Sequence, residues 1–262
     1  MSVLLSAASD GYESPGTGIF WQPLFGSGQW AVTRASVIAL LSVIVLSWWL
    51  LASTRRLAVV PSPGQFFTEQ VYAFVRNSVG RDIIGSREFL AYVPFLFSLF
   101  VFILLNNLFG IIPLVQFPTL ARIGFPIALT LIVYVLYHTV GVRRFGVGGY
   151  LKHMIPPGVP GWVLVILVPL EFLTYFFTRP VTLALRIWGN MFAGHLLLVL
   201  FITGAQYFIF ESGKLIYIPL GIFTYAFAFV MTVFEGLIEF LQSYIFVLLT
   251  ALYIAGSLTE EH

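Results

Sequence analysis

The sequence has little charge and no cysteine. Only 9% of its 262 residues are charged, whereas 59% are hydrophobic. A soluble domain carries roughly a quarter charged residues to cover its surface, so the shortage indicates that lipid is the main solvent. The lack of cysteine excludes disulfides, thiol catalysis and thiolate metal sites. The net charge of +2 and the lack of a basic, aromatic-rich patch argue against a nucleic-acid partner.

Several functional patterns are also missing from the sequence. It has no phosphate-binding loop, so we expect no nucleotide bound by this chain. It has neither a nucleophile-and-base pattern nor a paired metal-ligand spacing such as His-Glu-x-x-His, so we expect no metal, no other cofactor and no catalysis by the chain alone. No internal repeat is visible, which weakens the case for a secondary transporter because many transporters are built from repeats.

Long apolar runs organise the chain. A helix needs about 20 residues to cross the hydrocarbon core of a bilayer. Runs of about this length or longer occupy residues 31–51, 89–113, 125–142, 162–210 and 215–256. We therefore expect an all-α polytopic membrane protein with about five transmembrane helices, forming a single membrane domain over residues 1–262. Residues 1–28 do not read as a cleaved signal, because they lack a basic start before an apolar core. Residues 1–30 are expected to be an external N-terminal segment.

Residues 65–79 have a different pattern. Phe66, Phe67 and Phe74 alternate with polar residues at spacings that suit one face of a helix. This pattern predicts an amphipathic helix on the membrane surface.

The last two apolar runs are longer than one membrane crossing. At about 1.5 Å per residue, each helix would exceed a hydrocarbon core of roughly 30 Å. Each run is either two short spans or one strongly tilted or bent helix. Neither contains the cluster of turn residues that a hairpin needs, and Pro180 alone indicates a kink. We favour two long tilted helices that form a hairpin through Glu211–Lys214.

Basic residues are unevenly distributed between the predicted loops. Under the five-span interpretation, the loops around residues 52–88 and 143–161 lie on one side of the membrane. They contain Arg55, Arg56, Arg76, Arg81, Arg87, Arg143, Arg144 and Lys152, whereas the other side has Arg34, Arg122 and Lys214. The positive-inside rule then places the N-terminus outside and the C-terminal Glu260-Glu261-His262 in the cytoplasm. We expect a bacterial plasma membrane.

Ionisable residues inside the last two runs are exceptional, because a charge near mid-membrane costs several kcal/mol. Glu171 and Arg179 are interpreted as interfacial anchors with long side chains that reach water. Arg186 lies about midway along its run, and Asn190 lies one turn on, on the same face. Arg186 either faces a partner carboxylate or an ion path, or forms a salt bridge within the bundle; we favour the first.

The last run carries a polar stripe. Glu235, Glu239 and Gln242 recur at i, i+4 and i+7, which places them on one helix face. Two carboxylates one turn apart in an apolar setting disfavour simultaneous ionisation, an arrangement suited to passing protons. The alternative is that both line a watery crevice and stay hydrated. His195, on the facing helix of the predicted hairpin, either joins this relay or is a hydrogen-bonded packing residue.

Three segments resemble a known family, subunit a of the F-type ATP synthases. Arg179-Pro-Val-Thr-Leu-Ala-Leu-Arg186-Ile-Trp-Gly-Asn190-Met-Phe-Ala-Gly-His195 is similar to the family's signature helix. Glu235–Tyr253 is similar to its last helix, and Asn106-Asn107-Leu-Phe-Gly110-Ile-Ile-Pro113 resembles its second-span loop. The number of spans, the N-terminus-out topology and the final hairpin also fit, so the resemblance covers nearly the whole chain.

The resemblance implies a non-catalytic stator subunit in Fo, the membrane part of a proton-translocating ATP synthase. Its partners would be a ring of c subunits, peripheral-stalk b-type subunits and the lipid bilayer. Arg186 would face the ring carboxylates and separate an incoming from an outgoing proton half-channel, since its guanidinium is permanently charged. Asn190 and Gln242 would hold the arginine and the polar path. His195, Glu235 and Glu239 would belong to the outer half-channel.

The chain departs from the family pattern in a few places. Some members have an acid at the position of His195 and a histidine at that of Glu235, the reverse of this chain, which would keep an acid–imidazole pair. Some have aspartate where Gly110 stands, and Trp188 stands where phenylalanine or leucine is expected.

Other functional interpretations account for less of the sequence. The runner-up is a stand-alone proton-coupled secondary transporter in which Arg186 binds an anionic substrate. An intramembrane hydrolase would need a metal or nucleophile constellation, and a purely structural scaffold would leave the polar stripe unexplained.

Overall fold

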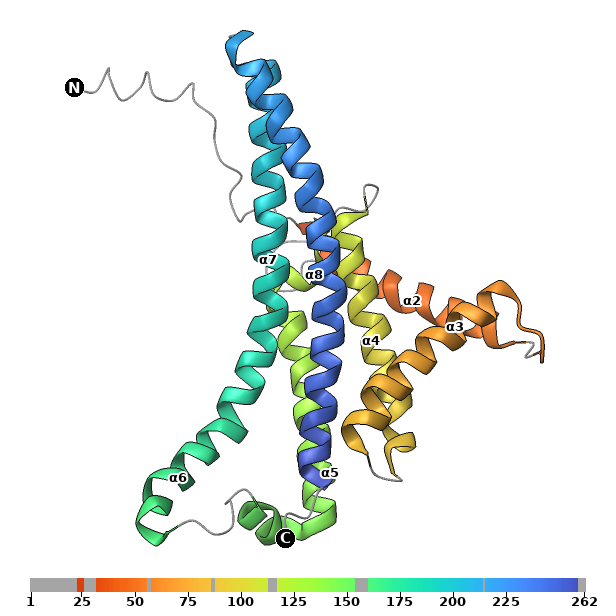
Figure 1. Ribbon diagram of the computed structural model, residues 1–262, viewed down its shortest axis with the longest axis vertical. Helices are drawn as coiled ribbons and strands as arrows, with labels where there is room; N and C mark the ends of the chain where they lie inside the picture. The colour runs from red at the N-terminus through yellow and green to blue at the C-terminus, as the bar shows by residue number, and fades with distance from the viewer. Residues whose placement is uncertain are drawn as a thin grey trace.

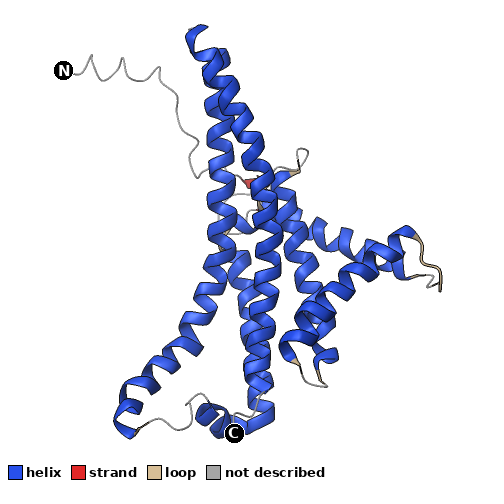
Figure 2. Ribbon diagram, viewed as in Figure 1, coloured by secondary structure: helices blue, strands red, loops and turns tan. Residues whose placement is uncertain are grey.

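A computed structural model describes residues 23–25, 32–55, 58–85, 88–112, 117–153, 160–213 and 215–258. This part of the chain is almost entirely helical (Figure 2). Five helical stretches are long and apolar enough to cross a membrane: Arg34–Thr54, Phe89–Ile111, Gly124–Lys152, Gly161–Glu211 and Leu215–Leu258. The predicted all-α polytopic fold class is confirmed. Most of the expected external segment and the C-terminal Glu260-Glu261-His262 lie outside the described residues.

The elements follow one another along the chain as seven α-helices and shorter pieces within the described ranges. The α-helices are α2 (Arg34–Thr54), α3 (Pro63–Phe74), α4 (Phe89–Ile111), α5 (Gly124–His153), α6 (Gly161–Leu173), α7 (Arg179–Gln206) and α8 (Ile218–Leu258). Segments of π-helix occupy Val75–Ile84, Thr174–Thr178 and Tyr207–Glu211, and 3-10 turns occupy Thr119–Ala121 and Leu215–Tyr217. Strands β1 (Pro23–Phe25) and β2 (Val32–Thr33) pair antiparallel.

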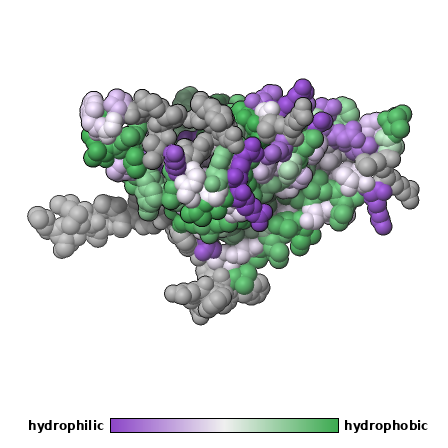
Figure 3. Space-filling model, turned by 90° about the horizontal axis from the view of Figure 1, so that it is seen from below, coloured by the Kyte–Doolittle hydropathy of each residue, from purple (hydrophilic) through white to green (hydrophobic). Residues whose placement is uncertain are grey.

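Large apolar side chains cover the outside of the spans. Trp48 is 71% exposed, Leu51 is 70% exposed and Trp162 is 78% exposed. Seen end-on, the surface is extensively hydrophobic, with hydrophilic patches between (Figure 3). Monomeric soluble proteins rarely expose such continuous apolar area, whereas lipid tails contact it without cost. The exposure explains how a chain with so little charge folds.

The amphipathic helix expected at residues 65–79 is α3 together with the π-helical segment that follows it. Its start is capped by the Ser62 hydroxyl, which accepts a hydrogen bond from the Gln65 backbone N–H at 3.3 Å. Gly85 ends it with a φ of 62°. Val75 and Val79 are buried, whereas Phe66 and Phe67 on the other face are exposed.

Helices α6 and α7 form one bent helix. Between α6 and α7, the Arg179 N–H bonds to the Thr174 carbonyl in a π-helical turn. Pro180, which follows, has no N–H to donate, so the backbone bonding must change at this place. In Figure 1, α6 leans away from the line of α7 at this turn. The long run is therefore one bent helix, as we favoured.

The last two long helices form the predicted hairpin. The chain reverses after Glu211 through Ser212 and Gly213, and Gly213 has a φ of 63°, which favours glycine. From this turn α7 and α8 run side by side (Figure 1). Their facing surfaces carry the polar residues singled out in the sequence.

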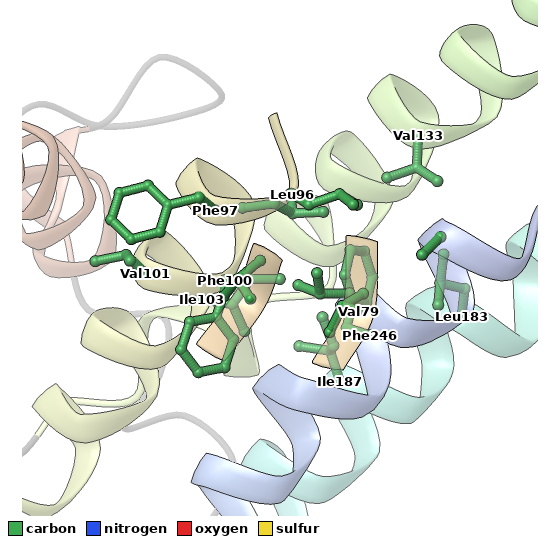
Figure 4. Packing of buried hydrophobic residues seen from close by; sticks show 14 of the residues in the cluster. Val79, Leu96, Phe97, Phe100, Val101, Ile103, Val133, Leu183, Ile187 and Phe246 are labelled. Atoms are coloured by element: carbon green, nitrogen blue, oxygen red, sulfur yellow. The ribbon is translucent and has the colours of Figure 1, made fainter. Parts of the chain in front are cut away.

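A hydrophobic core fixes α7 and α8 against the rest of the bundle. Phe246 of α8 and Ile187 of α7 are buried beside Ile103 of α4 and Val79 of the π-helical segment (Figure 4). In lipid such side chains gain little by leaving the solvent, so close van der Waals packing between the helices holds them together. The core sets the rotation of α4, α7 and α8 about their axes and so decides which side chains meet at the site.

Helix α5 extends beyond the apolar run expected at residues 125–142. It continues to His153 through a kink at Gly146, whose φ of 69° and ψ of 169° are not helical. The kink turns the end of α5 back onto its own preceding turns.

Candidate functional site

The polar stripe of α8 faces inward. Glu235, Glu239 and Gln242 are 6%, 4% and 3% exposed. Their side chains line a pocket of about 180 Å³ between α4, α7 and α8, and Asn107 and Asn190 contribute from the other two helices. The i, i+4, i+7 spacing therefore gathers three polar groups at the interface of the hairpin.

The two carboxyl groups have no hydrogen-bond partner in the described part of the protein. Both oxygens of Glu235 and both oxygens of Glu239 are buried without one. A buried, ionised and unpaired carboxylate is very costly, so each group needs either a bound proton or water. The pocket is large enough for several water molecules. Such groups can take up and release protons.

Asn107 joins α4 to this pocket. Its Nδ2 donates to the Glu239 backbone carbonyl at 3.1 Å and to the Ser243 hydroxyl at 3.2 Å. The neighbouring Asn106 donates instead to Ser42 of α2 at 3.0 Å. Sequence reasoning did not assign Asn107 to the site. The signal was present, because two consecutive amides inside an apolar span must find polar partners.

Two glycines give the acids room. A Cβ on Gly194 of α7 would lie 2.9 Å from Oε1 of Glu235. A Cβ on Gly110 of α4 would lie 3.2 Å from Oε1 of Glu239 and 3.4 Å from Cε of Met191. The space that an aspartate would need at position 110 is thus taken by Glu239. Gly110 leaves room for the Glu239 carboxyl because it has no side chain.

Arg186 lies outside this pocket, on the exposed surface of α7. Within the described residues it forms no hydrogen bond and no ion pair; the salt bridge found there joins Arg144 to Glu88. Asn190, one turn on and also exposed, donates from Nδ2 to Oε1 of Gln242 at 2.7 Å. The described bundle therefore offers no internal salt bridge to Arg186, although Asn190 connects its face of α7 to the pocket.

His195 is buried, 8% exposed, and follows the Gly194 that packs on Glu235. Because neither oxygen of Glu235 has a hydrogen-bond partner in the described residues, the acid–imidazole pair is not made as a direct hydrogen bond here. Trp188, the unusual residue of the signature segment, stacks on Phe192 with ring centroids 5.1 Å apart.

Comparison with known proteins decides the family. The family model described as ATP synthase A chain matches residues 35–255, most of the chain. The chain belongs to the ATP synthase A chain family. An "ATP synthase subunit a" from a Nocardioides species is 44% identical over 273 residues, covering 100% of this chain and 98% of the relative. Proteins of the same name from Streptomyces lividans and a Parafrankia species are 38% and 36% identical, covering 96% and 98% of this chain and 90% and 88% of theirs.

Membership in this family confirms the leading interpretation of the sequence and excludes the stand-alone transporter. The chain is a multi-pass membrane subunit of the ATP synthase complex, in Fo, and is not catalytic by itself.

Proposed function

We propose that Arg186 divides the proton path of this ATP synthase subunit into two half-channels and faces the ion-binding carboxylates of a neighbouring ring of c subunits. The subunit is the proton-translocating stator component of Fo. Peripheral-stalk b-type subunits would be further partners. The observation that carries the proposal is a separation of charge: Arg186 is exposed on α7 without a described carboxylate beside it, whereas Glu235 and Glu239 are buried around a pocket.

The exposure of Arg186 supports a partner outside this chain. An arginine near the middle of a span costs several kcal/mol unless it meets water or an opposite charge. The guanidinium stays charged throughout the physiological pH range. A carboxylate on an adjacent subunit would neutralise it, and it would favour the deprotonated form of that carboxylate while repelling a proton that approaches directly.

The buried stripe supports an outer half-channel. Along α8, Glu235 lies nearer the hairpin turn, Glu239 follows one turn later, and Gln242 reaches the level of Asn190 and Arg186. Each turn advances about 5.4 Å. A proton would move from Glu235 to Glu239 and then to the ring, with His195 at the same end of α7 and Asn107 shaping the pocket.

Contacts between the loops support the proposed orientation. Nη1 of Arg144 lies 3.1 Å from Oε2 of Glu88, which joins the two loops predicted to be cytoplasmic. At the other ends of the spans, Arg122 donates to the Thr33 hydroxyl. Arg56, Arg87 and Lys214 lie outside the described residues. We therefore place the N-terminus outside and the C-terminus in the cytoplasm of a bacterial plasma membrane.

The proposal is tested with Arg186→Ala in the assembled complex. We expect ATP-driven proton pumping into inverted membrane vesicles to be lost while a ring of small hairpin subunits still copurifies. Arg144→Ala, which removes an exposed cation from a surface salt bridge, is the matched control and should pump normally. Unchanged pumping by Arg186→Ala, or a wild-type subunit that copurifies with no ring, would refute the proposal.

A further inference from the structure

A second group of polar side chains lies on the other side of Arg186 from the acid pocket. Arg179 precedes Arg186 by two turns of α7, and Tyr253 follows Gln242 by three turns of α8. Because the two helices are antiparallel, both residues lie toward the end at which α6 and the end of α8 are found (Figure 1). The Arg179 Cζ lies 3.4 Å from the Tyr175 ring centroid and 5.2 Å from that of Tyr253. The polar residues of the hairpin thus form two groups with Arg186 between them.

His138 of α5 lies within the second group. Its ring stacks on Phe176 with centroids 5.0 Å apart and contacts Tyr134 and Tyr137 at 4.2 Å and 4.3 Å. Its Nδ1 lies 2.9 Å from the Tyr150 hydroxyl. Its Nε2 is buried and has no hydrogen-bond partner in the described part of the chain.

The buried Nε2 sets His138 apart from an ordinary packing residue. A buried polar atom without a partner costs about 1–3 kcal/mol. A phenylalanine would stack on Phe176 equally well and avoid that cost. Packing alone therefore does not explain an imidazole at this position. A phenylalanine would lack the two ring nitrogens, of which Nδ1 is hydrogen-bonded and Nε2 is not.

The backbone brings Tyr150 to His138. The positive φ of Gly146 reverses the end of α5, and a Cβ on Gly141 would clash with the Tyr150 ring. Tyr150 is 3% exposed, and Ser257 of α8 lies near its hydroxyl. The Ser257 hydroxyl itself donates to the Tyr253 backbone carbonyl at 2.9 Å. Ser257 lies at the end of the described part of α8. His138 and Tyr150 thus form a hydrogen-bonded pair, and Ser257 lies beside the pair on the side of the end of the bundle.

We propose that His138 and Tyr150 form a proton relay in the second half-channel, between the Arg186 face and the end of the molecule where α8 ends. This inference rests on the proposed function, because it assumes that Arg186 separates two proton passages. It assigns to the second passage residues from α5, outside the three motifs that resemble the family in the sequence.

The relay moves one proton without accumulating charge. A proton that arrives from the ring side binds Nε2 of His138, and the Nδ1 proton passes to the Tyr150 oxygen. The Tyr150 hydroxyl proton passes at the same time to a water molecule on the side of Ser257, which carries it out of the bundle. The imidazole is left with its proton on Nε2, and the ring turns over so that its two nitrogens exchange places before the next proton arrives. Either tautomer suits the contact with Tyr150, since a hydroxyl both donates and accepts.

Protonation of His138 depends on the titratable and charged groups that face it. The titratable and charged groups around it are Tyr134, Tyr137 and Tyr150 of α5, Arg179 of α7 and, next to Tyr137, Tyr253 of α8. Arg179 is the one cation in this set. Tyr134 packs on the imidazole through its ring, so its hydroxyl is the matched position for a control.

The test uses His138→Phe and Tyr150→Phe in the full ATP synthase, with Tyr134→Phe as the control. Proton pumping and passive proton conduction are measured in vesicles over the whole pH range in which the complex stays assembled, and normalised to the amount of assembled subunit. Both relay variants should lose about tenfold or more of the wild-type rate, and the pH profile of the remaining rate should differ from that of the wild type. Tyr134→Phe should keep both.

Two results would decide against the relay. Wild-type rates and pH profiles for both relay variants would overturn it, and so would a loss in Tyr134→Phe as large as that in Tyr150→Phe. If His138→Phe fails to assemble, Tyr150→Phe decides, because it keeps the ring and removes only the hydroxyl. Arg186→Ala is measured in parallel. If this variant still pumps protons, the proposed function is refuted. If it does not pump while both relay variants pump normally, only the relay is refuted.

Discussion

The two polar regions beside Arg186 are built differently. Between α4, α7 and α8, the oxygens of Glu235 and Glu239 have no described hydrogen-bond partners and line a pocket of about 180 Å³. Between α5, α7 and α8, His138 and Tyr150 are in direct hydrogen-bond contact at 2.9 Å and are packed among aromatic rings. The first region suits proton movement through water, and the second suits transfer between side chains. Arg186 lies between them on an exposed surface.

The largest effect is expected when the first region loses its proton carriers. Glu235→Gln combined with Glu239→Gln keeps the shape of the pocket but removes both titrating groups. We expect ATP-driven pumping in inverted vesicles to fall about 100-fold or more, the range seen for loss of proton-transfer groups. Glu88→Gln, which changes an exposed carboxyl in the same way, is the control. A double variant that pumps as fast as this control would remove the acids from the proton path.

A smaller effect is expected when the space beside the Glu239 carboxyl is filled. Gly110→Leu places a side chain where a Cβ alone would lie 3.2 Å from Glu239 and 3.4 Å from Met191. Overpacking a well-filled interior costs about 1–3 kcal/mol. We expect pumping per assembled subunit to fall by less than the loss of about 100-fold in the double variant, because the leucine crowds the Glu239 carboxyl without removing it. Gly124→Leu is the matched control, since nothing lies within 4 Å of a Cβ at that glycine. Equal rates for the two variants would show that proton movement does not depend on the space between Gly110 and Glu239.

The smallest effect is expected at the boundary between the pocket and the Arg186 face. Asn190→Leu removes the 2.7 Å hydrogen bond to Gln242. A neutral hydrogen bond contributes about 1 kcal/mol, so pumping should fall about fivefold. The double variant with Gln242→Leu should lose less than the sum of the two single losses, because the two residues share one interaction. Ser98→Ala, which removes an exposed hydroxyl bonded to a backbone carbonyl, serves as control. Strict additivity would show that the bond has no role in pumping.

Features repeated along the sequence were predictable. The apolar runs gave the five spans, since length and composition alone decide whether a helix crosses a bilayer. The spacing of Glu235, Glu239 and Gln242 placed them on one helix face, and the structure buries that face. The hairpin followed from the long runs and the polar residues between them.

Features that depend on contacts between distant segments were not predictable. Nothing local to Asn107 or Gly110 says that α4 turns these residues toward Glu239, because the rotation of a helix is set by core packing such as that of Ile103 on Phe246 (Figure 4). The return of Tyr150 onto His138 depends on one glycine, Gly146, with a positive φ. The exposure of Arg186 likewise became visible only once α7 was placed in the bundle.

The central claim is that Arg186 keeps protons from passing directly between two half-channels. It is tested most directly by passive proton conduction through Fo whose ring is covalently locked to the stator. Locked wild-type Fo should not conduct, because protons must ride on the ring. The account predicts that locked Arg186→Ala conducts protons, since the guanidinium that repels them is gone. A locked Arg186→Ala that is as tight as the locked wild type would contradict it.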